Sequence, residues 1–536
     1  MGSLPVVVLH DAQIRASASD ADGLVAVVFG VQNGPVDFGG VRSPVGLGLI
    51  LAAADGGVSA PVLLTSSPDA SAPAVAIGAE HPVVAWLDSA GGASGVWVWD
   101  SLSSSGPVAQ ELSTDGAAPA VAADDRGDVI VTWVDGASHE VMASWSVAGG
   151  PFGAPEVLSA PEGIDTAPVA TIDSQGTATI AWQANGQPAS GLVMAASAQP
   201  GGSFTAPIPA LTGPAGAFVR DLAIQSDSLG FVLVDAMIVG TPTWSDPGGD
   251  PTMTYAAATP GGAFNPQAQL AATNPDGVSS PSWATSAEGT ILEANSAQAA
   301  GGTGSLSTTE FAPDGTAATQ DAFQFPPADL AGVWNLTAGF DSDADAIVPF
   351  TISTALAPGS FGNPTAGSLL LTVEPAGGGA WCPAQLISGL MSPFFPLTES
   401  FGPDGSGVLL YQQTPFGEIA ATYLRPETGC APAAASTPIA LDPIASVDHA
   451  LKTARVTALC TDPSGCTGTL QLLDHSSRTL AAGTISARDR HSAAVRLQLT
   501  RLGRRTLEKH RHVPAAGRLV NGRNHRDLSQ VTLTRG

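Results

Sequence analysis

The residue types that most often do chemistry are scarce over most of this 536-residue chain. Residues 1–440 contain no lysine, only five arginines and three widely separated histidines. Neither Lys452 nor Lys509 follows a glycine, which excludes a P-loop, and no His-Glu-x-x-His or Gly-x-Ser-x-Gly motif occurs. Carboxylates remain as candidate catalytic groups, but they occur along the whole chain, so their spacing singles out no glycosidase pair.

One acidic segment has the spacing of a metal site. Asp341, Asp343 and Asp345 alternate along GFDSDADAIVPF and could present oxygen ligands in the manner of a calcium loop. Ala346 stands where such a loop carries glycine, and the segment aligns with the turn of a neighbouring repeat, DSQGTATIAW. Two interpretations therefore stay open, a calcium site and a solvated hairpin turn. The sequence predicts no other cofactor.

Charge is distributed unevenly along the chain. Residues 1–440 carry 5 bases and 40 acids, whereas residues 441–536 carry 15 bases and 7 acids, so the net charge of −27 combines −35 and +8. Such an abrupt change indicates a domain boundary. The acidic piece should repel nucleic acid and anionic membranes, which bind through clustered Lys and Arg. No apolar run approaches the roughly 18 residues of a transmembrane helix.

The organisation of the long piece follows from an internal repeat. APAVAIGAEHPVVAW, APAVAADDRGDVIVTW and APVATIDSQGTATIAW end at Trp86, Trp133 and Trp182. Each segment continues with a polar turn, a second apolar run and a Phe-Pro-Leu tail, a pattern that predicts four short strands. Weaker copies extend the series to eight units of about 45 to 57 residues.

Four-stranded units of this length predict an all-β fold, a β-propeller of seven or eight blades over residues 10–435. Trp86, Trp133 and Trp182 recur at one position of the repeat, where we expect them to form structural core between blades. Trp244 lies instead in the polar insert TPTWSDPGGDP, and a loop aromatic of this kind is a candidate ligand-binding residue.

The combination of Ala-Pro-Val-Ala, Asp-x-x-Gly, an apolar run into Trp and Phe-x-x-Pro-x-x-Leu resembles the BNR or sialidase-like propellers exported by actinobacteria. The resemblance implies the fold but not the activity. In the Asp box of sialidases, Trp follows Gly after two residues, whereas Trp133 follows Gly127 by six and Trp182 follows Gly176 by six. The arginine triad and the Tyr/Glu pair of sialidases have no recognisable counterpart in residues 1–440.

The basic C-terminal residues 446–536 alternate as short strands around one helical stretch, TRLGRRTLEKH, which predicts a small β-sandwich after a linker at 436–445. This module resembles the immunoglobulin-like appendages of exported actinobacterial proteins, in which a cysteine pair brackets a turn before a Gly-x-Leu strand. The resemblance implies a disulfide in such proteins, and four cysteines permit three pairings. The pairs that fit are Cys460 with Cys466, and then Cys382 with Cys430.

Disulfides predict an oxidising compartment, so we expect a secreted or cell-surface protein. The start MGSLPVVVLHDAQIR lacks a basic leader and a long apolar core, and we expect that a signal peptide was removed or that the start is truncated. The alternative is a cytosolic protein with four free cysteines.

Two functions follow from these patterns. The favoured one is a non-catalytic exported propeller that binds an extracellular glycan, protein or envelope polymer, with the basic module contacting anionic envelope polymer. The alternative is a secreted carbohydrate-active enzyme, a sialidase-like hydrolase or lyase that uses carboxylates at the channel mouth. Too few Arg, His and Lys are present to position catalytic carboxylates, which favours binding. Two carboxylates about 5 to 9 Å apart in the central channel, with an aromatic wall, would favour the enzyme, whereas a channel lined by Ser, Ala and Val would favour the binder.

Overall fold

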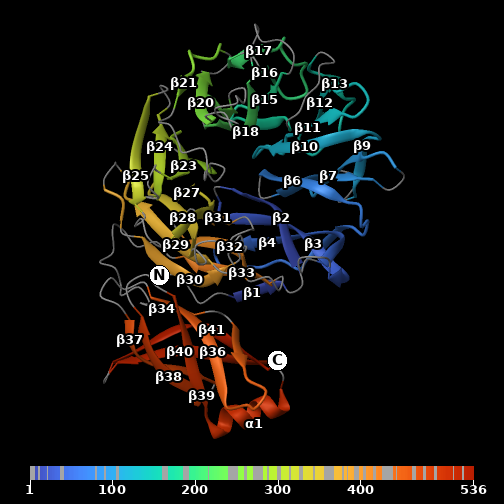
Figure 1. The fold of residues 1–536 in the computed structure, drawn as a ribbon. Coiled ribbons are helices and arrows are strands. Elements are labelled where there is room, and N and C mark those ends of the chain that lie inside the picture. Colours follow the sequence, from blue (N-terminus) through green and yellow to red (C-terminus); the bar gives the residue numbers. More distant parts are fainter. Residues whose placement is uncertain are drawn as a thin grey trace, which may run out of the picture.

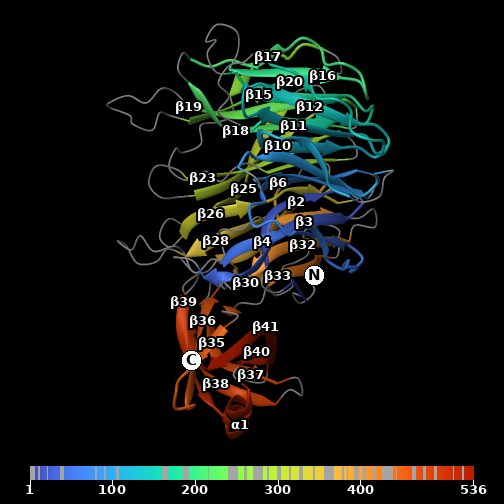
Figure 2. The same cartoon turned by 90° about the vertical axis from the view of Figure 1, so that its right-hand side faces the viewer.

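The chain folds into a ring of eight β-sheets and a smaller β domain below it (Figures 1 and 2). The structure is a computed structural model. It describes residues 6–9, 12–20, 22–36, 42–78, 81–89, 92–103, 108–159, 167–184, 192–214, 217–227, 229–239, 251–258, 262–269, 282–286, 289–298, 304–312, 316–324, 330–341, 344–354, 367–376, 380–382, 384–391, 397–401, 406–413, 418–424, 439–441, 444–460, 466–474, 478–487, 492–510, 512–521 and 524–535.

Each sheet of the ring is one blade of antiparallel strands in sequence order, which confirms the all-β propeller. The first four blades are β2 (Ala12–Ser19), β3 (Leu24–Val36), β4 (Arg42–Ala53) and β5 (Val62–Thr65); β6 (Ser71–Gly78), β7 (His81–Asp88), β8 (Gly95–Asp100) and β9 (Gln110–Ser113); β10 (Gly116–Ala123), β11 (Val129–Asp135), β12 (Val141–Ser146) and β13 (Glu156–Val157); β14 (Val169–Ile172), β15 (Ala178–Gln183), β16 (Val193–Ala198) and β17 (Ile208–Leu211).

The last four blades are less regular in sequence but keep the same topology. They are β18 (Phe218–Ser226), β19 (Val232–Val239), β20 (Pro251–Ala258) and β21 (Ala268–Gln269); β22 (Ser282–Thr285), β23 (Ile291–Gln298), β24 (Gly304–Phe311) and β25 (Ala317–Gln324); β26 (Leu330–Leu336), β27 (Gly339–Phe340), β28 (Ala346–Thr354), β29 (Gly367–Glu374) and β30 (Gln385–Met391); β31 (Thr398–Phe401), β32 (Gly407–Gln413), β33 (Glu418–Leu424) and β1 (Val6–Leu9).

In blades 1, 3, 4, 5 and 7 an aspartate side chain accepts hydrogen bonds within the turn between the first and second strand. In blade 3 the Oδ1 atom of Asp124 accepts hydrogen bonds from the backbone N–H of Arg126 (3.0 Å) and Asp128 (2.9 Å). Gly127, the fourth turn residue, has a φ of 79°, a conformation that glycine adopts without strain. Asp20, Asp173 and Asp227 make the same pair of bonds, and Ser286 and Asp341 occupy this place in blades 6 and 7.

Trp133 and Trp182 lie on the second strand of their blades, nine residues after this turn residue. We call this place the wedge position. Trp133 is 1% exposed and packs on Val83 and Val98 of the preceding blade. Trp182 is 2% exposed and packs on blade 3. In blades 1 to 8 the position holds Phe29, Trp86, Trp133, Trp182, Ala236, Asn295, Phe350 and Tyr411, all of them buried.

The ring is closed by its N-terminal strand. β1 is the outermost strand of the last blade and pairs antiparallel with β33, with Val6 opposite Ala421 and Leu9 opposite Ile419. The boundary expected at residue 10 therefore needs correction, because the propeller includes Val6–Leu9. The sequence missed this strand because its partner lies at the other end of the ring.

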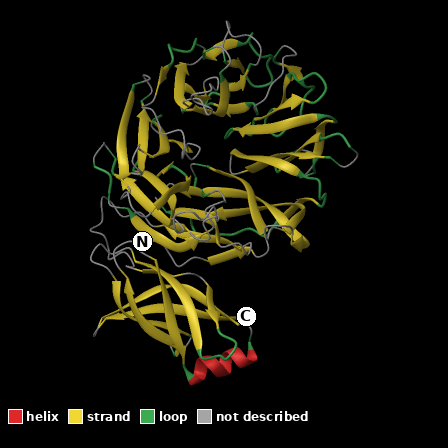
Figure 3. Cartoon of the chain, in the orientation of Figure 1, coloured by secondary structure: helices red, strands yellow, loops and turns green. Residues whose placement is uncertain are grey.

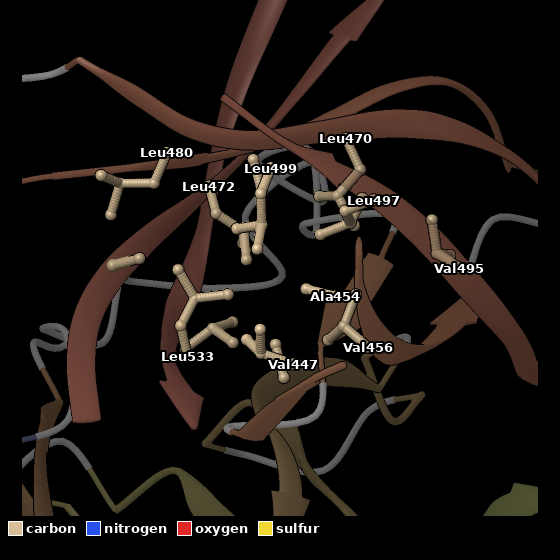
Figure 4. Close-up of a cluster of buried hydrophobic side chains, with 14 of the residues drawn as sticks. Val447, Ala454, Val456, Leu470, Leu472, Leu480, Val495, Leu497, Leu499 and Leu533 are labelled. Carbon is tan, nitrogen blue, oxygen red and sulfur yellow. The ribbon is translucent and has the colours of Figure 1, made fainter. Parts of the chain in front are cut away.

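The small domain is a curled sheet closed on itself. Its strands follow the order β34-β36-β35-β41-β40-β37-β38-β39, and β36 also pairs with β39. Leu470, Leu472, Leu497, Leu499 and Leu533 converge inside the sheet (Figure 4). The elements are β34 (Ile439–Leu441), β35 (Ile444–Val447), β36 (Thr453–Cys460), β37 (Cys466–Leu473), β38 (Thr479–Ala487), β39 (Ser492–Leu499), α1 (Arg501–Lys509), β40 (His512–Asn521) and β41 (Asn524–Arg535).

Two strands of this sheet lie inside the segment expected to be a linker. β34 pairs with β36, and β35 pairs with β36 and, in parallel, with β41. The linker boundaries 436–445 therefore need correction, since 439–441 and 444–445 belong to the domain's sheet. Short strands such as these have too few residues to show a period in sequence. The immunoglobulin-like assignment stays a prediction.

A single helix occurs among the described residues (Figure 3), and no described helix is long and apolar enough to cross a membrane. α1 begins at the N-cap Thr500, whose hydroxyl accepts a hydrogen bond from Gly503 N (3.1 Å). Gly503 and Leu507 are buried against the sheet. Arg501, Arg504, Arg505 and Lys509 are exposed.

Candidate functional site

The inner strands of the blades surround the axis of the ring (Figure 1), where neighbouring first strands contact one another. Most of their side chains are small: β6 reads SAPAVAIG, β10 reads GAAPAVAA and β14 reads VATI. The charged residues on these strands are Arg15, Arg220, Asp221 and Glu399. The inner strands are thus mainly Ala, Ser, Thr and Val.

Hydroxyl groups of the inner strands link one blade to the next. The Thr171 and Ser226 hydroxyls are 2.7 Å apart and join blades 4 and 5. The Ser282 hydroxyl accepts a hydrogen bond from Ala338 N (3.1 Å), which joins blades 6 and 7. The Ser400 hydroxyl donates to the carbonyl oxygen of Asp20 (2.6 Å), which joins blades 8 and 1. These hydroxyls therefore form hydrogen bonds between neighbouring blades.

An exposed aromatic side chain begins the inner strand of blade 5. Phe218 is 42% exposed and lies opposite Val239, the last residue of β19. The pairing of β18 with β19 is irregular between Val219 and Leu222, which sets Arg220 and Asp221 in a bulge, and Asp221 is partly exposed. Bulges re-aim side chains and recur beside functional sites.

Two carboxyl groups face one another between blades 5 and 6. Asp235 on β19 is 2% exposed and Glu293 on β23 is 1% exposed. Neither carboxylate oxygen of Glu293 has a hydrogen-bond partner. Phe311 packs edge-on against Tyr255 (4.9 Å between ring centres) and lies 6.0 Å from Trp283, so aromatic rings line the same interface.

Burial governs the protonation of this pair. It raises the pKa of Glu293 to about 8. The pKa of Asp235 is raised well above its usual range, first by burial and then by the negative charges of Glu293 and Asp221. The Tyr255 hydroxyl also has a raised pKa, through burial and the nearby Glu293. At neutral pH the pair therefore holds at least one proton.

Another buried carboxyl lies between blades 7 and 8. Glu399 on β31 is 2% exposed, and neither of its carboxylate oxygens has a hydrogen-bond partner. Its Oε1 lies where a β-carbon on Gly339 of blade 7 would approach to 3.0 Å, so the group faces the neighbouring blade. Burial raises the pKa of Glu399 well above its usual range.

Sequence reasoning missed Asp235, Glu293 and Glu399. The available signal is a single acid inside a run that is otherwise apolar and buried, as in VLVDAMIV of β19. An acid in a buried second strand has no water on either face of the sheet. Such positions can be found once the repeat has been aligned.

The acidic segment of blade 7 forms the first-hairpin turn. Asp341 Oδ1 accepts from Asp345 N (3.0 Å), and Asp345 Oδ1 accepts from Ala376 N (2.6 Å). Ala344, at the glycine place of the other turns, has a φ of 62°. Asp343 lies outside the described residues. Among the residues that are described, no group of three His, Cys, Asp or Glu is arranged for a metal ion.

Of the remaining predicted residues, Trp244 lies outside the described part of the chain, as does Cys430. Cys382 takes part in a disulfide, and so does Cys466. No described cysteine is free. The pairing of Cys460 with Cys466 and of Cys382 with Cys430 stays a prediction.

A scan of protein-family models finds no match to this chain, and no curated protein matches it. Among solved structures, the chain is similar to a fungal alcohol oxidase of the AA5 family in complex with copper, with 11% identity, 99% of each chain covered and a TM-score of 0.42. It is similar to the polysaccharide lyase Uly1, with 10% identity over 78% of this chain and 91% of that chain (TM-score 0.37), and to a Hadza microbial sialidase, with 12% identity over 79% and 96% (TM-score 0.33). Likeness at this level assigns no activity.

Proposed function

We propose that this chain is a non-catalytic β-propeller that binds a ligand, most simply an uncharged glycan, through the face of blade 5 where β18 begins. The observation that carries the proposal is Phe218, an aromatic side chain 42% exposed beside the bulge that holds Asp221. An exposed ring offers a flat apolar surface to a sugar, and a carboxylate accepts hydrogen bonds from its hydroxyls. The acidic ring disfavours an anionic ligand.

The test is a glycan array followed by titration calorimetry with the variants Phe218→Ala and Asp221→Asn. Leu229→Ala is the matched control, because Leu229 is 59% exposed in the turn at the opposite end of the same hairpin. We expect loss of most affinity in the first two variants and none in the control. Equal affinity in the native protein and all three variants would refute the site. If the ligand is a protein and not a glycan, the same two variants should weaken its binding.

A secreted carbohydrate-active enzyme is the second candidate, because Asp235 and Glu293 form a carboxyl pair with an aromatic wall. The pair is sealed between two blades, and a substrate would reach it only after those blades separate. Release of reducing sugar from polysaccharides by the native protein, lost in Glu293→Gln, would establish this alternative. The absence of turnover over the whole glycan panel would leave the binding function.

Export, the basic module and calcium belong to the same proposal. Cys382 and Cys466 are disulfide-bonded, which supports an oxidising compartment. The exposed bases of α1 could contact an anionic envelope polymer, and salt-dependent binding to poly(glycerol phosphate) measures this. Trp244 is proposed as a further ligand contact. Calcium at Asp341, Asp343 and Asp345 would show as a rise in melting temperature on adding CaCl2.

A further inference from the structure

The interface between blades 5 and 6 lacks the aromatic wedge that closes most of the ring. Blade 6 carries Asn295 at the wedge position, where blades 7 and 8 carry Phe350 and Tyr411. Asn295 is 5% exposed, and its Oδ1 atom has no hydrogen-bond partner. A buried amide oxygen without a partner costs free energy where an aromatic ring would contribute it.

The carboxyl pair lies at this same interface. Strand alternation turns Asp235 toward blade 6, together with Phe231 and Leu233, and turns Glu293 toward blade 5, together with Ile291. The other groups that act on the pair are also acidic or neutral: Asp221 from β18 and Tyr255 from β20. β22, which reads SWAT, has no titratable side chain. The only acid of β24 is Glu310, and its pKa is raised first by burial and then by the charge of Glu374 in blade 7.

We propose that the interface between blades 5 and 6 is a proton-dependent clasp, packed while the Asp235–Glu293 pair holds a proton and loosened when that proton is lost. Two ionised carboxylates cannot stay adjacent in a dry interface without a counter-charge. No described base acts on either group. Loss of the proton must therefore admit water, which separates the two blades locally.

The direction of the pH effect follows from where the proton is held. An exposed Glu ionises near its ordinary value of 4.5, whereas burial raises the pKa of Glu293 to about 8. Between these values opening the interface releases the proton of Glu293 and, because burial also raises the pKa of Asp235 well above its usual range, that of Asp235, so the equilibrium constant for opening should rise by more than tenfold and up to about a hundredfold per pH unit. Below about pH 3.8 it should stay constant, and above about pH 8 the contribution of Glu293 should end.

Hydrogen exchange at pH 5 to 9, corrected for intrinsic exchange rates, tests the clasp in the intact protein. We expect protection of β19 and β23 to fall by more than tenfold and up to about a hundredfold per pH unit up to about pH 8. Protection of β11 and β15, which carry Trp133 and Trp182, should stay constant. Glu293→Gln should reduce the slope in β19 and β23 to the tenfold or less per pH unit that buried Asp235 supplies by itself, and the matched control Glu111→Gln, on exposed β9, should leave the native slope unchanged.

Three results would overturn the proposal. The first is an unchanged pH dependence of protection in Glu293→Gln, and the second is an equal pH dependence in β11 and β15. The third is a pH dependence in the native protein that added CaCl2 removes, since the pair would then hold a cation. If Glu293→Gln does not fold, the comparison of strands in the native protein still decides. Asp235→Asn provides a second variant, in which a slope of about tenfold per pH unit should remain up to about pH 8, because burial alone raises the pKa of Glu293.

Discussion

Replacing Trp133 by alanine tests whether the repeat's aromatic residue holds the blades together. Trp133 is 1% exposed and packs among Val83, Val98 and Val131. β-Branched side chains have one preferred rotamer and collapse poorly into a cavity, so the loss should approach the upper part of the roughly 3–5 kcal/mol range for Trp→Ala. With an unfolding entropy of about 0.9 kcal/mol per kelvin for a ring of about 420 residues, the melting temperature should fall by about 3–6 °C.

The matched control is Trp133→Phe. The indole N–H of Trp133 has no hydrogen-bond partner, so phenylalanine removes volume but no polar contact. We expect a loss of about 1–2 kcal/mol. Differential scanning calorimetry of both variants at pH 6 gives the comparison. If the alanine variant loses less than about 1 kcal/mol, or if both variants lose equally, the ring is not held by packing at this position and the reasoning is refuted.

Three further predictions concern the closure of the ring and the contacts between neighbouring blades. Deleting residues 1–9 should lower the melting temperature and cause concentration-dependent dimers by exposing the edge of β33, whereas deleting residues 1–5 should not; light scattering after size exclusion measures this. Gly78→Ala should cost about 1–3 kcal/mol in urea unfolding, because a β-carbon there would overlap the backbone of Asp124, while Gly153→Ala should be neutral because its surroundings are open. Glu399→Gln should melt like the native protein at pH 4 and above it at pH 8, since burial raises the pKa of Glu399 and ionisation penalises the fold; melting at equal temperatures at pH 8 would contradict this.

The prediction of the fold succeeded where neighbouring residues carry the information. Asp124 and Asp173 make turns with backbone groups two and four residues away, and a glycine follows each at a fixed distance. The wedge position repeats at a constant distance from that turn, so Trp133 and Trp182 could be assigned to one structural place. The candidate site could not be predicted in the same way, because nothing near Phe218 in sequence shows that its side chain is left exposed.

The amino-acid sequence by itself determined the blade: its four strands, its turn and the place of its large buried residue, since these depend on backbone hydrogen bonding and alternation within about 50 residues. Only the tertiary structure decided which strand closes the ring and which carboxyl groups lose their water. β1, at the start of the chain, pairs with β33, at the end of the propeller. Asp235 of blade 5 lies near Glu293 of blade 6. The physical reason is that strand pairing and the burial of charge depend on which surfaces come into contact. Closure of the ring determines which surfaces those are.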